Sequence, residues 1–223
     1  MLGTIDPRKP LTLAGVYTSF QRFVGGNARA RFVSEFLRPR ATDRLLNIGC
    51  GPADILDHLP EGIDYVGFDL SGKYIEAARR RYGDRAQFHC QRVGASDVGQ
   101  FGKFDLVLAH GVLHHLDDAE AGHLFELAAA ALAPGGRLVT FDGCYVDRQS
   151  PIARRMLAWD RGKFVRQRVE YESLAEQNFV HVEAEVRHDL LRIPYTHLIL
   201  QCRKPIRVVA SRCEGGESRR RES

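Results

Sequence analysis

Short apolar runs alternate with segments of helical spacing over residues 44–141, and this alternation predicts a layered α/β domain. Five runs predict strands: Arg44–Ile48, Tyr65–Phe68, Gln87–Val93, Asp105–Ala109 and Arg137–Phe141. The segments between them predict helices over Ala53–Leu59 and between Ser71 and Gly83, and a polar loop after Val93. Asp117 and Glu120 predict a capping box for one more helix, which ends near Ala133 before Pro134-Gly135-Gly136. Because strands separated by helices pair in parallel, we expect an open sheet with helices on both faces.

The pattern changes after the fifth predicted strand. Residues 147–168 are rich in arginine and predict a helical insertion, and Tyr171–Gln177 predicts one more helix. His181–Arg187 and Thr196–Cys202 alternate or run apolar around a polar loop, which predicts a terminal antiparallel hairpin at the edge of the sheet. The arginines of the insertion either form a solvated helix face or attract an acidic substrate.

Helical spacing also occurs before the first strand, over residues 13–38, with a break at Gly25-Gly26-Asn27 and an end at Pro39. We therefore expect N-terminal cap helices over residues 1–38, a main domain over residues 39–204 and a basic tail over residues 205–223. Within the main domain, residues 145–178 are expected to form an insertion on the substrate side.

The composition is typical of a globular protein, with 44% hydrophobic and 27% charged residues. The net charge of +4 resides in residues 203–223, which hold seven basic and three acidic side chains. This distribution argues against a nucleic-acid groove across the fold. The tail is expected to be solvated and disordered, and a binding arm for nucleic acid or anionic lipid is the alternative.

Cysteine usage and the N-terminal sequence favour a cytoplasmic location. The five cysteines are odd in number and form no C-x-x-C motif, so they predict neither a disulfide framework nor a metal site. Asp6, Pro7 and Pro10 interrupt the region where a signal peptide needs an apolar core. No stretch approaches the ~18 apolar residues of a membrane-spanning helix.

The most informative motif is a glycine turn followed by an acid at the end of the next strand. The first predicted strand ends in Gly49-Cys50-Gly51, and the second ends at Asp69, 20 residues beyond Gly49. In parallel α/β sheets, small residues at such a turn allow an adenosine-containing cofactor to approach closely. A carboxylate at the second strand's end then accepts hydrogen bonds from ribose hydroxyls.

The residues after the turn help to distinguish between cofactors. A dinucleotide site favours glycine or alanine where this chain has Asp54, and Pro52 lies between. An acid in the first turn of a helix repels a pyrophosphate, which disfavours a nicotinamide dehydrogenase. A cofactor with a smaller anionic group and a positive centre fits better.

These residues resemble the class I S-adenosylmethionine (SAM) methyltransferases, whose first motif is similar to Leu46–Pro52. Phe104–Leu116 and Leu132–Val139 resemble the family's fourth strand and the entry to its fifth. The resemblance runs from about Tyr17 to Arg203. It implies a Rossmann-like sheet of the seven-stranded methyltransferase type, with SAM as cofactor, S-adenosylhomocysteine (SAH) as product, and no metal.

The resemblance also implies which residues contact the cofactor. Backbone groups of the glycine turn and of the following helix would meet its methionine part. A carboxylate would take the ribose hydroxyls, and His110 would lie near the methionine end through its carbonyl. The implied cofactor-binding residues are Tyr17, Asn47, Gly49, Cys50, Gly51, Asp69, Leu70, Gln91, Val93 and His110.

Three positions depart from the family's pattern. Asn47 stands where an acid usually helps to hold the cofactor ammonium, and Ala53 stands where glycine is common. The third strand of the family often ends in an acid that accepts from the adenine amino group, but this chain has Gln91-Arg92-Val93. Gln91 or the later Asp97 could take that role.

Residues that could act on a substrate lie near the ends of the fourth and fifth predicted strands. His114 and His115 either serve as a catalytic base or orient the turn before the next helix. Asp142 and Tyr145 are the candidate substrate residues, because open α/β sheets bind ligands at the carboxyl ends of their strands. His197 is expected to pack within the last strand.

By analogy with the family, the expected reaction is methyl transfer to an O, N or C atom of a small molecule, with secondary metabolites and activated sugars as the leading classes. His110-Gly111-Val112-Leu113 replaces the Asn-Pro-Pro-Tyr segment of adenine-modifying enzymes, so no nucleic-acid partner is expected. The alternative function is a non-catalytic binding or scaffold domain, which Asn47 and Arg92 motivate.

Overall fold

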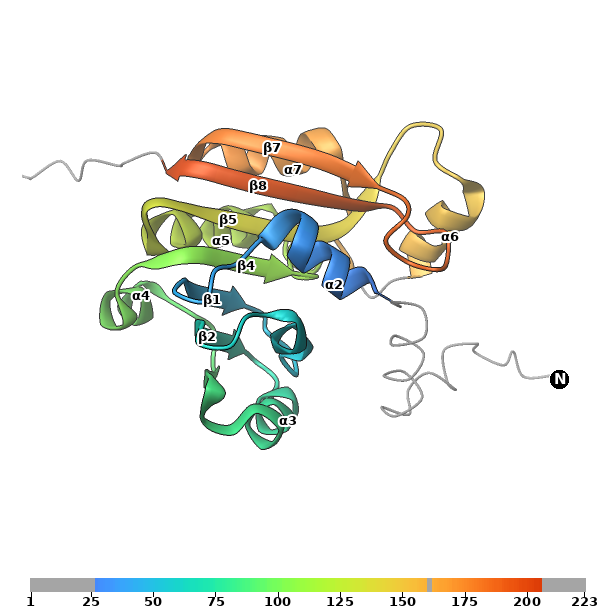
Figure 1. Ribbon diagram of the computed structural model, residues 1–223. Helices are drawn as coiled ribbons and strands as arrows, with labels where there is room; N and C mark the ends of the chain where they lie inside the picture. The colour runs from blue at the N-terminus through green and yellow to red at the C-terminus, as the bar shows by residue number, and fades with distance from the viewer. Residues whose placement is uncertain (1–26, 160–161, 206–223) are drawn as a thin grey trace, which may run out of the picture.

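The computed structural model of the protein describes residues 27–159 and 162–205 (Figure 1). Seven strands of the sheet lie in the order β3-β2-β1-β4-β5-β8-β7, and the short β6 pairs with the end of β5. The strands are β1 (Arg44–Ile48), β2 (Asp64–Asp69), β3 (Gln87–Cys90), β4 (Phe104–His110), β5 (Leu132–Tyr145), β6 (Arg166–Gln167), β7 (Phe179–Arg187) and β8 (His197–Pro205). β1 to β5 pair in parallel, whereas β8 is antiparallel to both β5 and β7. The predicted α/β sheet with a terminal antiparallel hairpin is confirmed.

Helices lie on both faces of the sheet, as predicted. Their bounds are α2 (Ala28–Phe32), η2 (Val33–Leu37), η3 (Asp54–His58), α3 (Gly72–Tyr82), η4 (Gly83–Arg85), α4 (Ala95–Phe101), η5 (Leu113–His115), α5 (Asp118–Ala131), α6 (Pro151–Trp159) and α7 (Arg168–Glu176). η2 is a π-helix, and η3, η4 and η5 are 3-10 helices. None of the helices in these ranges is long and apolar enough to cross a lipid bilayer.

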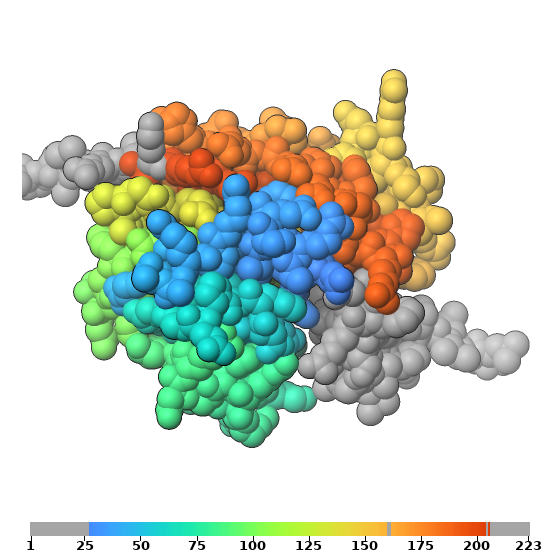
Figure 2. All heavy atoms as spheres, viewed as in Figure 1, coloured from blue at the N-terminus to red at the C-terminus, as the bar shows by residue number. Residues whose placement is uncertain are grey.

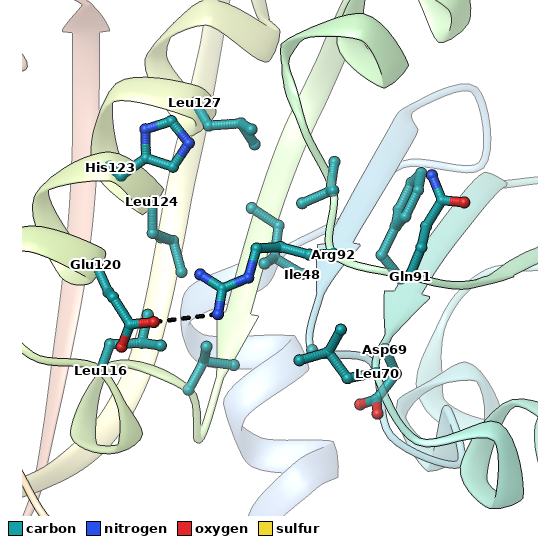
Figure 3. A pocket seen from close by; sticks show the side chains of 14 residues that line it. Ile48, Asp69, Leu70, Gln91, Arg92, Leu116, Glu120, His123, Leu124 and Leu127 are labelled. Atoms are coloured by element: carbon teal, nitrogen blue, oxygen red, sulfur yellow. Dashed lines mark hydrogen bonds and ion pairs between the residues drawn. The ribbon is translucent and has the colours of Figure 1, made fainter.

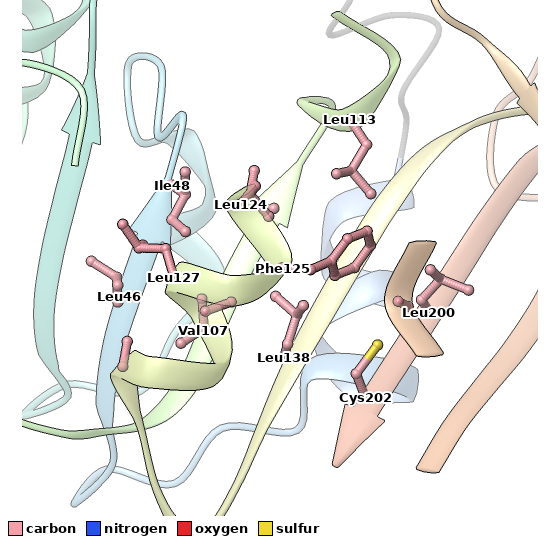
Figure 4. Packing of buried hydrophobic residues seen from close by; sticks show 14 of the residues in the cluster. Leu46, Ile48, Val107, Leu113, Leu124, Phe125, Leu127, Leu138, Leu200 and Cys202 are labelled. Carbon is pink, nitrogen blue, oxygen red and sulfur yellow. The ribbon is translucent and has the colours of Figure 1, made fainter. Parts of the chain in front are cut away.

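Side chains of the central strand β4 alternate between two apolar clusters. Val107 and Ala109 pack in the cluster that includes residues of α4, α5 and α7 (Figure 4). Leu106 and Leu108 pack in the cluster that includes residues of α2, η2 and α3. Because successive side chains of a strand point to opposite faces, the centre of this strand is apolar on both faces and needs helices on both sides.

Two predicted helices begin at the residues that the sequence indicates. The Ser71 hydroxyl accepts a hydrogen bond from the Tyr74 backbone N–H at 3.4 Å, and α3 ends at Gly83. The Asp117 carboxylate accepts from the Glu120 backbone N–H at 2.9 Å and caps α5. The second half of the predicted capping box is not formed with that cap, because the Glu120 carboxylate contacts Arg92 instead.

The predicted helix over Ala53–Leu59 is wrong in type and extent. The chain forms the five-residue 3-10 helix η3, and Ala53 before it has a left-handed backbone with φ of 57°. Asp54 and Asp57 form ion pairs with Arg81 of α3, so these acids are neutralised by a neighbouring helix. The N-terminus expected to hold the methionine carboxylate is thus that of a short 3-10 helix, and its role stays a prediction.

Other element boundaries also differ from the prediction. The segment after β3 was expected to be a loop but forms α4, and β3 ends at Cys90 instead of Val93. β5 begins at Leu132, and its pairing with β4 shifts register between Phe104 and Leu106. The Pro134-Gly135-Gly136 segment therefore lies inside an irregular strand and does not precede it. In its described part, the arginine-rich segment forms the nine-residue helix α6 and the short strand β6.

The first described elements, α2 and η2, pack on the face that carries the second apolar cluster. Figure 2 shows this N-terminal segment (blue) at the centre of the face, below the C-terminal strands (orange-red). Arg31 of α2 and Arg187 of β7 both form ion pairs with Asp189, at 2.7 and 2.8 Å. Both arginines also pair with Glu35, at 2.9 and 2.6 Å, and complete a closed ring of charges.

The predicted cap over residues 1–38 is described only from Asn27 onward. Tyr17, which was predicted to contact the cofactor, lies outside the described residues, as does the tail over residues 206–223.

Candidate cofactor and active site

A pocket opens at the carboxyl ends of β1 and β2 (Figure 3). Its walls are mainly apolar and come from both strands, from the segment after β3 and from α5. The lining residues include five that the sequence analysis assigned to the cofactor: Gly49, Asp69, Leu70, Gln91 and Val93. The strand ends therefore bring together residues that lie as far apart in the chain as Gly49 and Val93.

Two backbone groups hold the Asp69 carboxylate at the end of β2. Oδ2 accepts a hydrogen bond from the Gly51 N–H at 2.9 Å, and Oδ1 accepts from the Ser71 N–H at 2.8 Å. A carboxylate oxygen has two lone pairs, so each oxygen keeps acceptor capacity for a further donor. The glycine turn thus orients the acid, which favours binding of vicinal hydroxyls.

The glycine turn itself needs residues without a side chain. Gly49 has φ of 70°, and a Cβ there would lie 2.6 Å from Cγ2 of Val112. Gly51 has φ of 56°, and a Cβ there would meet no atom within 4 Å. Only glycine adopts such backbone angles readily, and the open space beside Gly51 leaves room for a ligand against the backbone.

Cys50 of the turn contributes through its backbone. Its N–H donates to the Phe68 carbonyl at 2.9 Å, which joins the turn to β2. Its thiol is buried under Gly67, where an added Cβ would lie 2.9 Å from Sγ. Burial raises the pKa of Cys50 to about 12, so the thiol stays protonated and acts as a small apolar group.

Asn47 of β1 is buried, at 3% exposure, and does not line the pocket. Its Nδ2 donates to the Tyr65 hydroxyl at 2.8 Å, whereas its Oδ1 is buried without a hydrogen-bond partner. Burial raises the pKa of Tyr65 above its ordinary value, so the phenol stays neutral. An orphaned buried carbonyl is costly unless a donor reaches it, and a ligand ammonium is one such donor.

An ion pair crosses the far side of the pocket. Nη2 of Arg92 lies 3.1 Å from Oε1 of Glu120, which projects from the first turn of α5 (Figure 3). Gln91 does not join this pair, since its Nε2 donates to Oδ1 of Asp97 at 2.9 Å. Two charged side chains therefore face each other at the rim of an otherwise apolar slot.

Known proteins resemble this chain in sequence and in fold. Residues 46–138 match a family model described as a methyltransferase domain. Among solved structures, phospholethanolamine N-methyltransferase 2 of Haemonchus contortus, in complex with phosphomonomethylethanolamine and SAH, has a TM-score of 0.66 at 16% identity. That match covers 89% of this chain and 59% of the other. The SAM-dependent methyltransferase SibL has a TM-score of 0.65 at 18% identity, over 89% of this chain and 60% of the other. Residues 46–138 are thus similar to a methyltransferase domain, on a fold shared with SAM-dependent methyltransferases.

Two curated relatives match parts of the chain. An uncharacterized protein of Synechococcus sp. is 36% identical over 105 residues, and the 27-O-demethylrifamycin SV methyltransferase of Amycolatopsis mediterranei is 35% identical over 113 residues. The matches cover 44% and 46% of this chain, but only 25% and 39% of the relatives' lengths. The similarity therefore concerns a domain, and the activities of the whole relatives do not transfer to this chain.

SAM is the cofactor of such a domain, and the residues of the pocket fit it. The anchored Asp69 carboxylate suits ribose hydroxyls, and the apolar slot next to it suits the faces of a purine. The open space at Gly51 and the unpartnered Asn47 Oδ1 suit the methionine part, whose ammonium needs an acceptor. The pocket and the glycine turn thus offer groups suited to the ribose, the purine and the ammonium of SAM.

His114 and Asp142, predicted separately as base and substrate residue, lie in contact. Nδ1 of His114 is 2.8 Å from Oδ1 of Asp142, and the backbone N–H of His114 donates to the same oxygen at 3.3 Å. Asp142 is 2% exposed, and burial raises its pKa although the hydrogen bonds from His114 oppose that rise. His115 is exposed, and its ring lies 4.2 Å from that of His114.

Two other histidines, His110 and His197, belong to an aromatic stack on the face of the sheet that carries the second apolar cluster. The ring of His110 stacks on Phe141 at 4.5 Å and meets Phe32 edge-on at 5.4 Å. His197 lies on the other side of Phe141, at 4.3 Å, and packs within β8 as predicted. Burial lowers the pKa of His110 to about 4 and that of His197 to about 3, so both rings are neutral near pH 7.

A second cavity lies at the carboxyl end of β5, where a substrate site was predicted. It is lined by the segment before α6 and by the loop before β8, including Gln149, His188 and Tyr195. Tyr145 at the end of β5 is half-buried, and the guanidinium of Arg154 lies 5.3 Å from its ring centre. Among the described arginines of this region, Arg148, Arg154, Arg155 and Arg168 are exposed to solvent, whereas Arg166 is buried.

Two residues without a predicted role in the site, Arg166 and Glu120, are prominent in the structure. Arg166 is buried and donates to the backbone carbonyls of Leu113 and Leu116 at 3.0 and 2.7 Å, which fixes the turn that carries His114. Glu120 was predicted only as a helix-capping residue. No local signal distinguishes these side chains from exposed ones, because their partners lie in other elements.

Proposed function

We propose that this chain is a SAM-dependent methyltransferase that transfers a methyl group to an O, N or C atom of a small molecule, of the secondary-metabolite or activated-sugar class. The observation that carries the proposal is the Asp69 carboxylate, held by Gly51 and Ser71 beside an apolar slot. The similarity to the rifamycin methyltransferase, a small-molecule enzyme by its name, supports the class of acceptor.

Bound SAM supplies a methyl group on a positively charged sulfur that a nucleophile can displace. The chain's own contribution is mainly positioning, which can account for a large part of the acceleration in such a displacement. Asp69 would accept from the ribose hydroxyls, and Oδ1 of Asn47 would accept from the ammonium. The backbone of the glycine turn would hold the methionine part close to the ends of β1 and β4.

A nucleophile that carries a proton needs a base. In this proposal, His114 takes that proton, and Asp142 orients its ring through the contact at Nδ1 and stabilises the protonated imidazole. His115 is the alternative base, because its ring is exposed next to His114. The acceptor is proposed to enter at the cavity after β5, near Tyr145.

Calorimetric titration with SAM and with SAH tests the proposal. We expect both ligands to bind at micromolar concentrations, and an Asp69→Ala variant to lose ~1–3 kcal/mol of binding free energy through the lost charge-assisted hydrogen bonds. Asp84→Ala is the matched control, because Asp84 is exposed on η4 and does not line the pocket. Unchanged affinity in Asp69→Ala contradicts the assigned role of Asp69.

The second candidate function is a non-catalytic scaffold that keeps the fold. Two observations favour it. Asn47 is uncharged where the family usually has an acid for the cofactor ammonium. The Arg92–Glu120 ion pair also occupies the rim of the pocket opposite Asp69. This alternative predicts that neither SAM nor SAH binds in the titration. Binding of both ligands, followed by turnover in an acceptor screen, excludes it.

A further inference from the structure

The apolar slot beside Asp69 has a carboxylate at its far rim that comes from α5 and not from the third strand. Among the side chains that line the slot, Asp69 and Glu120 are the two carboxylates. Figure 3 shows Glu120 extending toward Arg92 from the side opposite Asp69 and Leu70. The slot therefore has one acid at each end.

Of the two residues named from the sequence for the adenine amino group, Gln91 lines the slot but carries no charge, and the Asp97 carboxylate is engaged elsewhere. Asp97 accepts from the Gln91 amide with Oδ1 at 2.9 Å, and from the Gly94 backbone N–H with Oδ2 at 2.8 Å. Both bonds serve the start of α4, and Asp97 does not line the slot. Consequently Glu120 is the better-placed acceptor.

The Arg92 guanidinium needs a negatively charged partner at this rim, and it fixes the orientation of the Glu120 carboxylate. Its guanidinium lies 3.1 Å from Oε1 of Glu120, and both side chains are partly exposed, at 59% and 38%. An arginine alone at this rim would present only donors, which would oppose the amino group of an adenine. The ion pair places an acceptor at the rim and keeps Oε2 without an ion-pair partner among the described residues.

We propose that Glu120 accepts a hydrogen bond from the exocyclic amino group of the cofactor's adenine, and that Arg92 is a positioning residue that holds this carboxylate at the slot. The inference rests on the proposed function, since it assumes that the ribose lies at Asp69. The purine is attached directly to that ribose, so the apolar slot between Asp69 and Glu120 is the space available to it. A base with a carbonyl in place of the amino group would set an acceptor against a carboxylate, which is unfavourable.

The test compares two ligands that differ only at this group: SAH and S-inosylhomocysteine, in which hypoxanthine replaces adenine. We expect the wild-type protein to bind SAH at least about tenfold more tightly. Glu120→Gln should reduce this preference to about twofold or less, because an amide can donate to a carbonyl as well as accept from an amine. Arg92→Ala should reduce it by an intermediate factor, and Arg92→Lys should restore part of it.

Asp97→Asn is the matched control, since it makes the same change of acid to amide and can still cap α4. Its preference for SAH should equal that of the wild type. A preference that is lost in Asp97→Asn and kept in Glu120→Gln overturns the inference, as does a wild type that binds both ligands equally. A wild type that binds neither ligand overturns the proposed function itself, so the two failures are distinguishable.

Discussion

Asp142 of β5 accepts two hydrogen bonds from one residue, His114, through its ring Nδ1 at 2.8 Å and its backbone N–H at 3.3 Å. Both residues are buried, so the contact joins the turn after β4 to the neighbouring strand within the protein interior. We expect Asp142→Ala to lower the free energy of unfolding by roughly 2–4 kcal/mol, because it leaves two buried donors unpaired. Urea denaturation measures this loss.

The conservative variant separates a structural role of this contact from a catalytic one. Asp142→Asn keeps an acceptor oxygen, so its melting temperature should stay close to that of the wild type, whereas its turnover should fall if His114 is the base. His115→Ala should change stability by less than about 1 kcal/mol, because His115 is exposed. Full turnover in Asp142→Asn would contradict the role of the dyad in catalysis.

Gly49 is expected to tolerate substitution less well than Gly51. Gly49→Ala combines a left-handed backbone with a Cβ only 2.6 Å from Val112, and should cost about 2–4 kcal/mol of stability. Gly51→Ala has the same kind of backbone but no atom within 4 Å, and should cost about 1–2 kcal/mol. Adding Val112→Ala to Gly49→Ala should recover part of the loss. Equal melting temperatures of the two single variants would show that the steric contact is unimportant.

Arg166 and Arg168 provide a matched pair of arginines with different burial. Arg166 is 6% exposed and donates to Asp118 and to the carbonyls of Leu113 and Leu116. Its replacement by methionine leaves buried carbonyls unpaired and should cost roughly 2–4 kcal/mol. Arg168 pairs with Glu172 on an exposed helix face, so Arg168→Met should cost about 0.5 kcal/mol or less. Thermal denaturation of both variants in the same buffer measures the two losses of stability. A larger loss in Arg166→Met than in Arg168→Met is the expected result of burial.

The ring of Arg31, Glu35, Arg187 and Asp189 predicts a loss of stability in acid. Hydrogen bonds from Arg187 first, and then from Arg31, lower the pKa of Glu35 and that of Asp189. An acid whose pKa is lower in the folded state stabilises the fold above its unfolded pKa of about 4, and this contribution is lost as the pH falls through the folded pKa. The urea midpoint should therefore decrease from about pH 5 to pH 3.

Arg187→Met should make that pH dependence weaker, because it removes the main partner of both acids. Since the ring of charges is partly exposed, high salt should also weaken the pH dependence of the urea midpoint, but by less than the substitution does. Arg80→Met is the control, because Arg80 lies on the surface of α3 and forms a long ion pair with Glu76, at 3.7 Å, away from the ring. A pH dependence that is identical in Arg187→Met and the wild type would show that the ring does not contribute.

Patterns of local sequence were enough to predict the α/β sheet, the glycine turn and the acid at Asp69. Strands such as β4 are apolar on both faces and are bounded by turn residues, and this signal lies within a few consecutive positions. The family resemblance places the cofactor at the same turn, and the pocket there includes Gly49, Asp69 and Leu70. These features depend on local backbone conformation and on the alternation of side chains along a strand. Both are determined by residues that are neighbours in the sequence.

Interactions between distant residues decided the rest. Asp54 pairs with Arg81 and, at 3.7 Å, with Arg29, so the acid that distinguished between cofactors in the sequence is a structural ion-pair partner at the start of η3. Arg92 and Glu120 lie 28 positions apart in the chain, as do His114 and Asp142. The sequence alone determined which strand ends carry polar groups. Only the tertiary structure decided which of those groups are in contact, because the partner of a side chain depends on how separate elements pack. Buried charges in addition need an oppositely charged or hydrogen-bonding partner.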